Sequence, residues 1–270
     1  MHRILLLGWR YRGRDCTMPM KPPLQQSKRQ HQQGIALVVI AALFIAFSVV
    51  AAVAVERNTV TQLITRRDST AEQLQRISNA IIEYSVFNQV GGKLVYPCPA
   101  RPDLAGTDAN FGVSVNTAGT QDCNVTNHPG ITLLGTDVIR GMVPIQSLSQ
   151  YGLGVNDAFD PWNNRIMYVV NRQMTRGGSS ANTNNPTVTD PVTAQAYVAP
   201  DFIVLSYGRD GVGAARREST TISIACTDGT TKRRFENCDA DTSFVLTPTF
   251  TAATAGDLSY FDDVLSFYRQ

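Results

Sequence analysis

Several residue types are absent from long parts of this 270-residue sequence, and each absence limits what the chain can be. Positions 35–55 contain no charged residue, and neither proline nor glycine occurs between Gly34 and Gly91. Both residues end or weaken helices, so a long helix can pass through this region without interruption. Histidine occurs three times in the chain, and only His128 follows the apolar run. This count argues against histidine-dependent catalysis and against histidine-rich zinc sites.

The apolar run that follows Gly34 is long enough to cross a membrane. Positions 35–55 read IALVVIAALFIAFSVVAAVAV, with Ser48 as the only hydroxyl. At about 1.5 Å of rise per residue, a helix of this length spans the roughly 30 Å hydrocarbon core of a bilayer. A core helix of a soluble protein keeps a polar stripe, and this run has none. We therefore predict a transmembrane helix over 35–55.

Charge differs between the two sides of this helix. Residues 1–34 carry seven Lys and Arg against one Asp, a net charge of +6, whereas residues 56–270 have a net charge of −4. Basic residues favour the cytoplasmic side of a membrane. The pattern predicts a cytoplasmic N-terminus and an exported, acidic C-terminal part, which makes nucleic acid an unfavourable partner.

Beyond position 55 the helix is expected to continue with one apolar face. Apolar residues recur at steps of three and four, at Val60, Leu63, Ile64, Ala71, Leu74, Ile77, Ile81 and Tyr84. This spacing predicts an amphipathic helix over 56–90 that stops at the glycine pair Gly91-Gly92. A membrane-proximal coiled coil is the alternative, but the stripe is short and Arg67 interrupts it.

The segment before the apolar run indicates how the N-terminus is processed. A signal peptide has an apolar region of about 7–15 residues followed by a small-residue cleavage site. Here the run is longer, and the basic leader KRQHQQG at 28–34 places Gly34 before it. This arrangement resembles the N-terminus of type IV pilins and type II secretion pseudopilins. The resemblance implies that prepilin peptidase removes residues 1–34 and that Ile35 becomes the N-methylated first residue. A start at Met18 would shorten the leader to 17 residues, closer to the family.

One position departs from the family pattern. Family members usually carry Glu five residues after the cut, where this chain has Val39. In the family, that Glu is thought to pair with the N-terminal amine of the subunit ahead. The chain therefore resembles minor members that lack the Glu, which implies a place at or near the filament tip.

The exported part contains short motifs in the order in which pseudopilin-like proteins carry them. The motifs are PCPA at 97–100, then 141–144, 160–168, 206–211 and 262–267. Local patterns predict strands at 165–170, 202–207 and 261–268, a hairpin around Asp228-Gly229, and loops over 101–130 and 177–192. We expect an α+β fold in which the long helix packs on a mainly antiparallel sheet in a globular head over 91–270, and the resemblance implies a pilin-like arrangement.

Cysteine usage is typical of an exported domain. Cys16 lies in the leader, which leaves Cys98, Cys123, Cys226 and Cys238. An even number of cysteines outside the cytoplasm suggests two disulfides. Among the three possible pairings we favour the local one, Cys98–Cys123 and Cys226–Cys238, since the second bond would tie the ends of the expected hairpin. Zinc binding is the alternative, but no Cys-x-x-Cys spacing occurs.

Few residues in the exported part suggest a chemical site. His128 lies in the loop sequence TNHPG, and no phosphate-binding loop or His-Glu-x-x-His motif occurs, so we expect no enzymatic activity. Asp210, Asp239 and Asp241 are weak calcium candidates, because hard cations take carboxylate ligands, although solvated turns explain them better. The small basic clusters at 216–217 and 232–234 fit a solvated surface better than a nucleic-acid site.

These features together predict a minor pseudopilin or pilin-like subunit of a type II secretion or type IV pilus-like machine. Such a subunit crosses the bacterial inner membrane once and exposes its head to the periplasm until it is extracted into a filament. Its partners would be other pilin-like subunits, prepilin peptidase and the inner-membrane assembly platform, with no cofactor apart from the calcium candidate. The alternative is a signal-anchored periplasmic binding protein or enzyme that never assembles. The mature N-terminus separates the two, because an anchor keeps residues 1–34.

Overall fold

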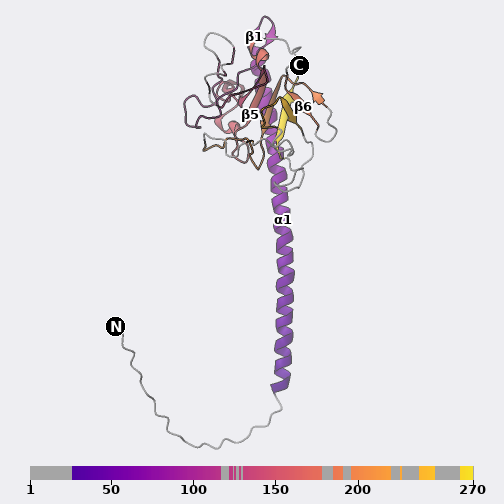
Figure 1. Ribbon diagram of the computed structural model, residues 1–270. Helices are drawn as coiled ribbons and strands as arrows, with labels where there is room; N and C mark the ends of the chain where they lie inside the picture. The colour runs from indigo at the N-terminus through magenta and orange to yellow at the C-terminus, as the bar shows by residue number, and fades with distance from the viewer. Residues whose placement is uncertain are drawn as a thin grey trace, which may run out of the picture. The chain divides into compact units, whose positions relative to one another are not determined.

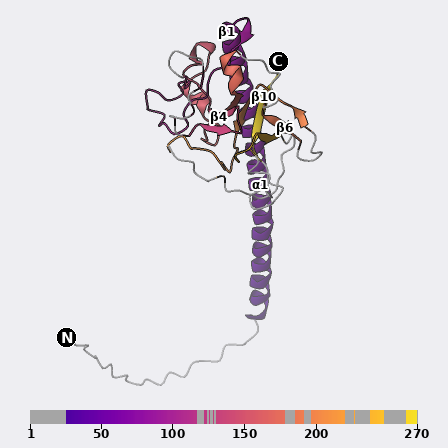
Figure 2. The same cartoon turned by 45° about the horizontal axis from the view of Figure 1, so that its top comes forward.

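The computed structural model describes residues 26–116, 122–123, 125, 128, 130–177, 185–190, 196–219, 226, 237–246 and 262–269 (Figure 1). The chain divides into two compact units, Met1–Thr59 and Val60–Gln270. Helix α1 (Gln26–Phe87) contributes residues to both units, and the strands belong to the second (Figures 1 and 2).

In the first unit, α1 carries a segment that is long and apolar enough to cross a membrane. This segment is Leu37–Val55, and none of it is buried within the protein. Its one hydroxyl, Ser48 Oγ, donates to the carbonyl of Phe44 at 2.7 Å, so the backbone of the helix itself satisfies this polar group. Because every polar group is satisfied internally and every face is apolar, the surface suits a lipid environment.

In the second unit, α1 buries only one face. Leu74, Ile77 and Ile81 are fully buried, whereas Glu72 and Glu83 on the other face are exposed. The buried face packs on side chains of the main sheet in one hydrophobic cluster. Each buried Leu or Ile contributes about 1.5–3 kcal/mol, which fixes the helix to the sheet. The predicted α+β arrangement, one apolar helix packed against an antiparallel sheet, is confirmed.

The helix ends slightly earlier than the sequence predicts. It stops at Phe87, where both the backbone N–H and the side-chain amide of Asn88 donate to the carbonyl of Tyr84, at 3.0 and 2.8 Å. Gly91 and Gly92 instead form the turn between β1 (Gln89–Val90) and β2 (Lys93–Leu94). Both glycines have positive φ, which a two-residue hairpin turn of this kind requires. The predicted helical stretch to residue 90 was therefore too long by three residues.

The main sheet has five strands, all antiparallel, in the order β10-β8-β5-β4-β3. Their bounds are β3 (Thr132–Leu134), β4 (Val138–Met142), β5 (Met167–Asn171), β8 (Phe202–Ser206) and β10 (Val264–Tyr268). Every residue of β5 and β8 is buried, so these central strands have no solvent face. Tyr168 and Phe202 face the cluster that includes α1, whereas Val169 and Ile203 face a second core.

A smaller sheet lies over the second core. It has three strands in the order β7-β6-β9, with β6 (Thr187–Thr189) antiparallel to β7 (Ala196–Val198) and parallel to β9 (Ser243–Val245). Val188 of β6 and Phe244 of β9 are buried in the same cluster as β5 and β8. The predicted loop over 177–192 therefore contains a strand, which its polar sequence concealed.

Three short 3-10 helices complete the described elements, namely η1 (Ser149–Tyr151), η2 (Val155–Ala158) and η3 (Arg172–Arg176). The strands predicted at 165–170, 202–207 and 261–268 correspond to β5, β8 and β10 within three residues at each end. Strands β3 and β4 were not among the strands predicted from the sequence. The hairpin expected around Asp228-Gly229 lies outside the described residues.

Candidate functional site

The residues expected at the processing site lie at the start of α1. Gly34 and Ile35 fall within the helical span Gln26–Phe87, three and two residues, respectively, before the apolar segment Leu37–Val55. Val39, at the position where the family usually has Glu, lies in that apolar segment with its side chain 52% exposed. No polar side chain therefore interrupts the apolar surface at this position.

Asp160 organises the chain just before β5. Its carboxylate accepts the backbone N–H groups of Trp162 and Asn164 at 2.9 and 2.8 Å, and the hydroxyl of Ser206 at 2.6 Å. Asn164 donates its side-chain amide both to Asp160 and to the carbonyl of Gly208. Burial raises the pKa of Asp160 to about 6, while these hydrogen bonds act to lower it. The motif around Asp160 thus joins the start of β5 to the end of β8.

Arg165 is a fully buried cation that holds two loops in place. It donates to four backbone carbonyls, those of Pro102, Leu104, Arg216 and Ser219. Its guanidinium also lies 5.3 Å from the centre of the Phe111 ring. Desolvation lowers the pKa of Arg165. Because carbonyl oxygens surround the charge, the residue fixes loop geometry and is closed to ligands.

Three carboxylates form the acidic cluster, defined here as Asp210, Asp262 and Asp263. One oxygen of each lies within 4.8 Å of the others, and Asp262 and Asp263 are buried. Asp262 accepts the backbone N–H of Asp210 at 2.9 Å. The backbone at Gly208 lies very close to the backbone of Asp262. Gly208 has φ +61°, and a Cβ placed there would lie 2.3 Å from the carbonyl oxygen of Asp262. Only glycine fits at this position.

The acidic cluster has the chemistry of a hard-cation site. Burial, followed by the neighbouring carboxylate of Asp262, raises the pKa of Asp263 well above its ordinary value. A divalent cation would relieve this crowding, and carboxylate oxygens are the ligands that calcium prefers. Asp210 was a calcium candidate from the sequence, but Asp239 and Asp241 do not join it among the described residues. Their carboxylates instead accept backbone N–H groups of their own turn, from Asp241 and Ser243 respectively.

Asn237 connects the acidic cluster to the smaller sheet. Its side chain accepts the N–H of Val245 at 2.7 Å and donates to the carbonyl of the same residue at 3.2 Å. The same amide donates to Asp263 at 2.8 Å, and Tyr207 donates to the Asn237 carbonyl. Asn237 is fully buried, so every one of these contacts is shielded from water. The sequence offered no signal for it beyond an Asn next to a cysteine.

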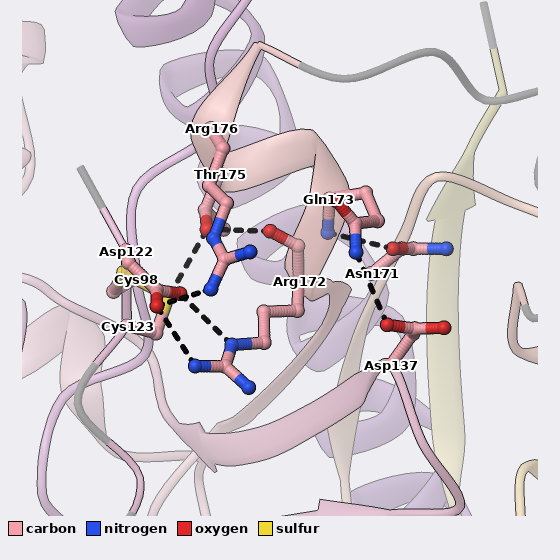
Figure 3. Close-up of polar contacts among 9 residues, drawn as sticks. All are labelled: Cys98, Asp122, Cys123, Asp137, Asn171, Arg172, Gln173, Thr175 and Arg176. Carbon is pink, nitrogen blue, oxygen red and sulfur yellow. Dashed lines mark hydrogen bonds and ion pairs between the residues drawn. A yellow bond between two sulfur atoms is a disulfide. The ribbon is translucent and has the colours of Figure 1, made fainter.

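The first disulfide joins Cys98 to Cys123, the pair favoured from the sequence. Both cysteines are buried in a small apolar cluster with Val115, Ile131 and Ile139. Figure 3 shows the polar contacts on its outer side, where Arg172 and Arg176 of η3 converge on Asp122. Hydrogen bonds from Arg172 lower the pKa of Asp122 to about 2.

The second disulfide joins Cys226 to Cys238, again the favoured pair. Cys238 is 5% exposed and belongs to the second core. Arg140 of β4 donates to the carbonyls of Asn237 and Asp239, the residues on either side of Cys238. A cation therefore lies beside the backbone on both sides of Cys238.

Comparisons with protein-family models, with curated proteins and with solved structures find no match to this chain.

Proposed function

We propose that this chain is a minor pseudopilin or pilin-like subunit of a type II secretion or type IV pilus-like assembly. The observation that carries the proposal is a single helix, Gln26–Phe87, with two kinds of surface. Its segment Leu37–Val55 is apolar on all sides and unburied, and its later turns bury one face on an antiparallel sheet. A subunit that waits in a membrane and then packs through its helix against other subunits needs both surfaces in one element.

The proposed location is the inner membrane, with the N-terminus in the cytoplasm and the head in the periplasm. The basic residues before the apolar segment support this orientation. The two disulfides support an oxidising compartment for the head. Prepilin peptidase and the assembly platform are the proposed membrane partners, and the proposed role is assembly without catalysis.

The proposed position is at or near the filament tip. Val39 is apolar and exposed on the membrane segment, so it offers no carboxylate to the N-terminal amine of a neighbouring subunit. An amine that remains charged in an apolar filament core without a partner costs several kcal/mol. A subunit at the tip has no subunit ahead of it, so the missing carboxylate costs nothing there.

The deciding experiment is the intact mass of the mature chain in a host that expresses prepilin peptidase. We expect a chain that begins at methylated Ile35, and the variant Gly34→Leu should accumulate as unprocessed precursor. The matched control Gln32→Leu adds the same side chain to the leader and should be processed normally. A mature chain that retains residues 1–34 in the unmodified protein would favour the signal-anchored alternative and end this proposal.

The tip position has a separate test. Purified filaments should contain far fewer copies of this subunit than of the major subunit, measured by quantitative mass spectrometry. Val39→Glu should raise its incorporation along the shaft, while Val38→Glu, one position away on the helix, should not. A near-equal ratio for the unmodified chain would refute the tip position and leave the processing result unaffected.

A further inference from the structure

The two disulfides differ in how closely solvent approaches them. Cys98 and Cys123 are 1% and 0% exposed. Cys226 is half-buried, and together with Cys238 it lines a pocket of about 90 Å³. This volume has room for several water molecules and for the end of a thiol side chain. A reagent can therefore reach the second disulfide while the first stays closed.

The pocket is also lined by a cation, the guanidinium of Arg140, whose charge would favour opening of this disulfide. Arg140 lines it and donates to the carbonyls of Asn237 and Asp239, at 3.5 and 2.8 Å, which brackets Cys238. Among the described residues that line the pocket, the acidic one is Asp103, and its carboxylate forms a bidentate ion pair with Arg101. A neighbouring guanidinium stabilises a thiolate, and a more stable thiolate leaves faster in exchange.

We propose that Cys226–Cys238 is a thiol-exchange site that reacts with a dithiol reductant while the protein remains folded. The attacking thiolate bonds to Sγ of Cys226, the more exposed residue of the pair, and the Cys226–Cys238 bond breaks. Cys238 leaves as a thiolate beside Arg140. The second thiolate of the reductant then attacks the mixed disulfide, which releases Cys226 as a thiolate and the reductant as a cyclic disulfide. Each protein thiolate takes a proton from water.

The fold can tolerate this exchange because other contacts hold the segment that carries Cys238. The side chain of Asn237 bonds to both backbone groups of Val245, and Arg140 holds the carbonyls on either side of the cysteine. Through Asn237, the same segment contacts Asp263 of the acidic cluster. Opening the disulfide therefore removes one of several restraints on the segment that supports the acidic cluster.

The test follows each disulfide separately in the full chain held in detergent. The protein is treated with dithiothreitol under native conditions, quenched with an alkylating reagent, digested and quantified by mass spectrometry. We expect Cys226 and Cys238 to be alkylated at least about tenfold faster than Cys98 and Cys123, at a rate proportional to thiol concentration. Parallel opening of both bonds, or a rate independent of thiol concentration, would mean that reduction follows unfolding and would overturn the proposal.

Two further arms test the direction of attack and the cation. Glutathione, a monothiol, should be trapped on Cys226, and an adduct on Cys238 would contradict the proposed leaving group. Arg140→Gln should slow opening about threefold to tenfold, while Arg140→Lys keeps the charge and should retain most of the rate. Arg172→Gln removes a cation beside the other disulfide and should leave the Cys226–Cys238 rate unchanged. An unchanged rate in Arg140→Gln, with a native circular dichroism spectrum, would remove Arg140 from the mechanism.

Discussion

Asp160 and Asp263 are both buried aspartates, and they face opposite surroundings. Asp160 accepts hydrogen bonds from two backbone N–H groups, a hydroxyl and an amide. Among the described residues, Asp263 accepts a hydrogen bond from the side-chain amide of Asn237 and lies close to the carboxylates of Asp210 and Asp262. The first arrangement surrounds one buried carboxylate with hydrogen-bond donors, which is how buried polar groups are satisfied in folded proteins. The second concentrates negative charge, which a fold tolerates only when protonation or a cation relieves it.

Among the changes that distinguish Asp160 from Asp263, we expect the largest effect on stability from removal of the hydrogen-bonded carboxylate of Asp160. Asp160→Ala would leave the N–H groups of Trp162 and Asn164 and the hydroxyl of Ser206 buried without their acceptor. We expect a loss of about 4 kcal/mol in the free energy of unfolding, measured by urea denaturation. Asp108→Ala, at an exposed turn, is the control and should cost less than about 1 kcal/mol. A similar loss in both variants would deny Asp160 a special role.

The second prediction tests whether Asn237 stabilises the region around the acidic cluster. Asn237→Ala removes both hydrogen bonds to Val245 and the side-chain amide that donates to Asp263. We expect a loss of about 2–3 kcal/mol, since buried groups on both partners lose their hydrogen bonds. Asn116→Ala is the control, because Asn116 is exposed and its backbone bridge to Cys123 survives the change. If Asn237→Ala costs no more than the control, the link between the smaller sheet and the acidic cluster is not a stabilising one.

The contrast between these sites also shows which features the sequence could reveal. Part of the hydrogen bonding at Asp160 is local, because Trp162 and Asn164 lie within four residues of it and within the motif at 160–168 that the sequence shows. The helix was predictable for the same reason, because its apolar periodicity is local. Asn237 and Asp263 are 26 residues apart, and only the tertiary fold brings them together. Asp239 and Asp241 were chosen for their closeness in sequence, yet Asp210 meets Asp262 and Asp263 in space.

The pH dependence of stability gives a third, smaller effect. The pKa of Asp160 is raised to about 6 in the folded protein, so between about pH 4 and pH 6 the folded state holds a proton that the unfolded state has lost. Stability therefore falls as the pH rises through this window, by about 1–2 kcal/mol. Urea midpoints between pH 4 and pH 7 should show this slope in the unmodified chain and a smaller slope in Asp160→Asn.

Asp122 supplies the opposite sign as an internal check. Arg172 and Arg176 lower its pKa to about 2, so its contribution is present above about pH 4 and is lost as the pH falls toward 2. Asp122→Asn should leave the slope between pH 4 and pH 6 unchanged. If Asp122→Asn flattens that slope and Asp160→Asn does not, the protons bound in this window belong to another group.

The smallest expected effect on stability is that of a cation bound to the acidic cluster. Calcium bound to Asp210, Asp262 and Asp263 would relieve the repulsion that raises the pKa of Asp263, so it should stabilise the folded protein. For a dissociation constant of about 1 mM, 5 mM calcium adds about 1 kcal/mol, which a thermal unfolding scan detects. Asp210→Asn keeps the size of the side chain and should abolish the shift. Asp239→Asn should leave it intact, because the carboxylate of Asp239 accepts the N–H of Asp241 in its own turn and is not part of the acidic cluster. A shift that survives Asp210→Asn but not Asp239→Asn would place the cation in the turn that contains Asp239 and Asp241. Equal stabilisation by magnesium and calcium would indicate screening of charge without a coordinated ion.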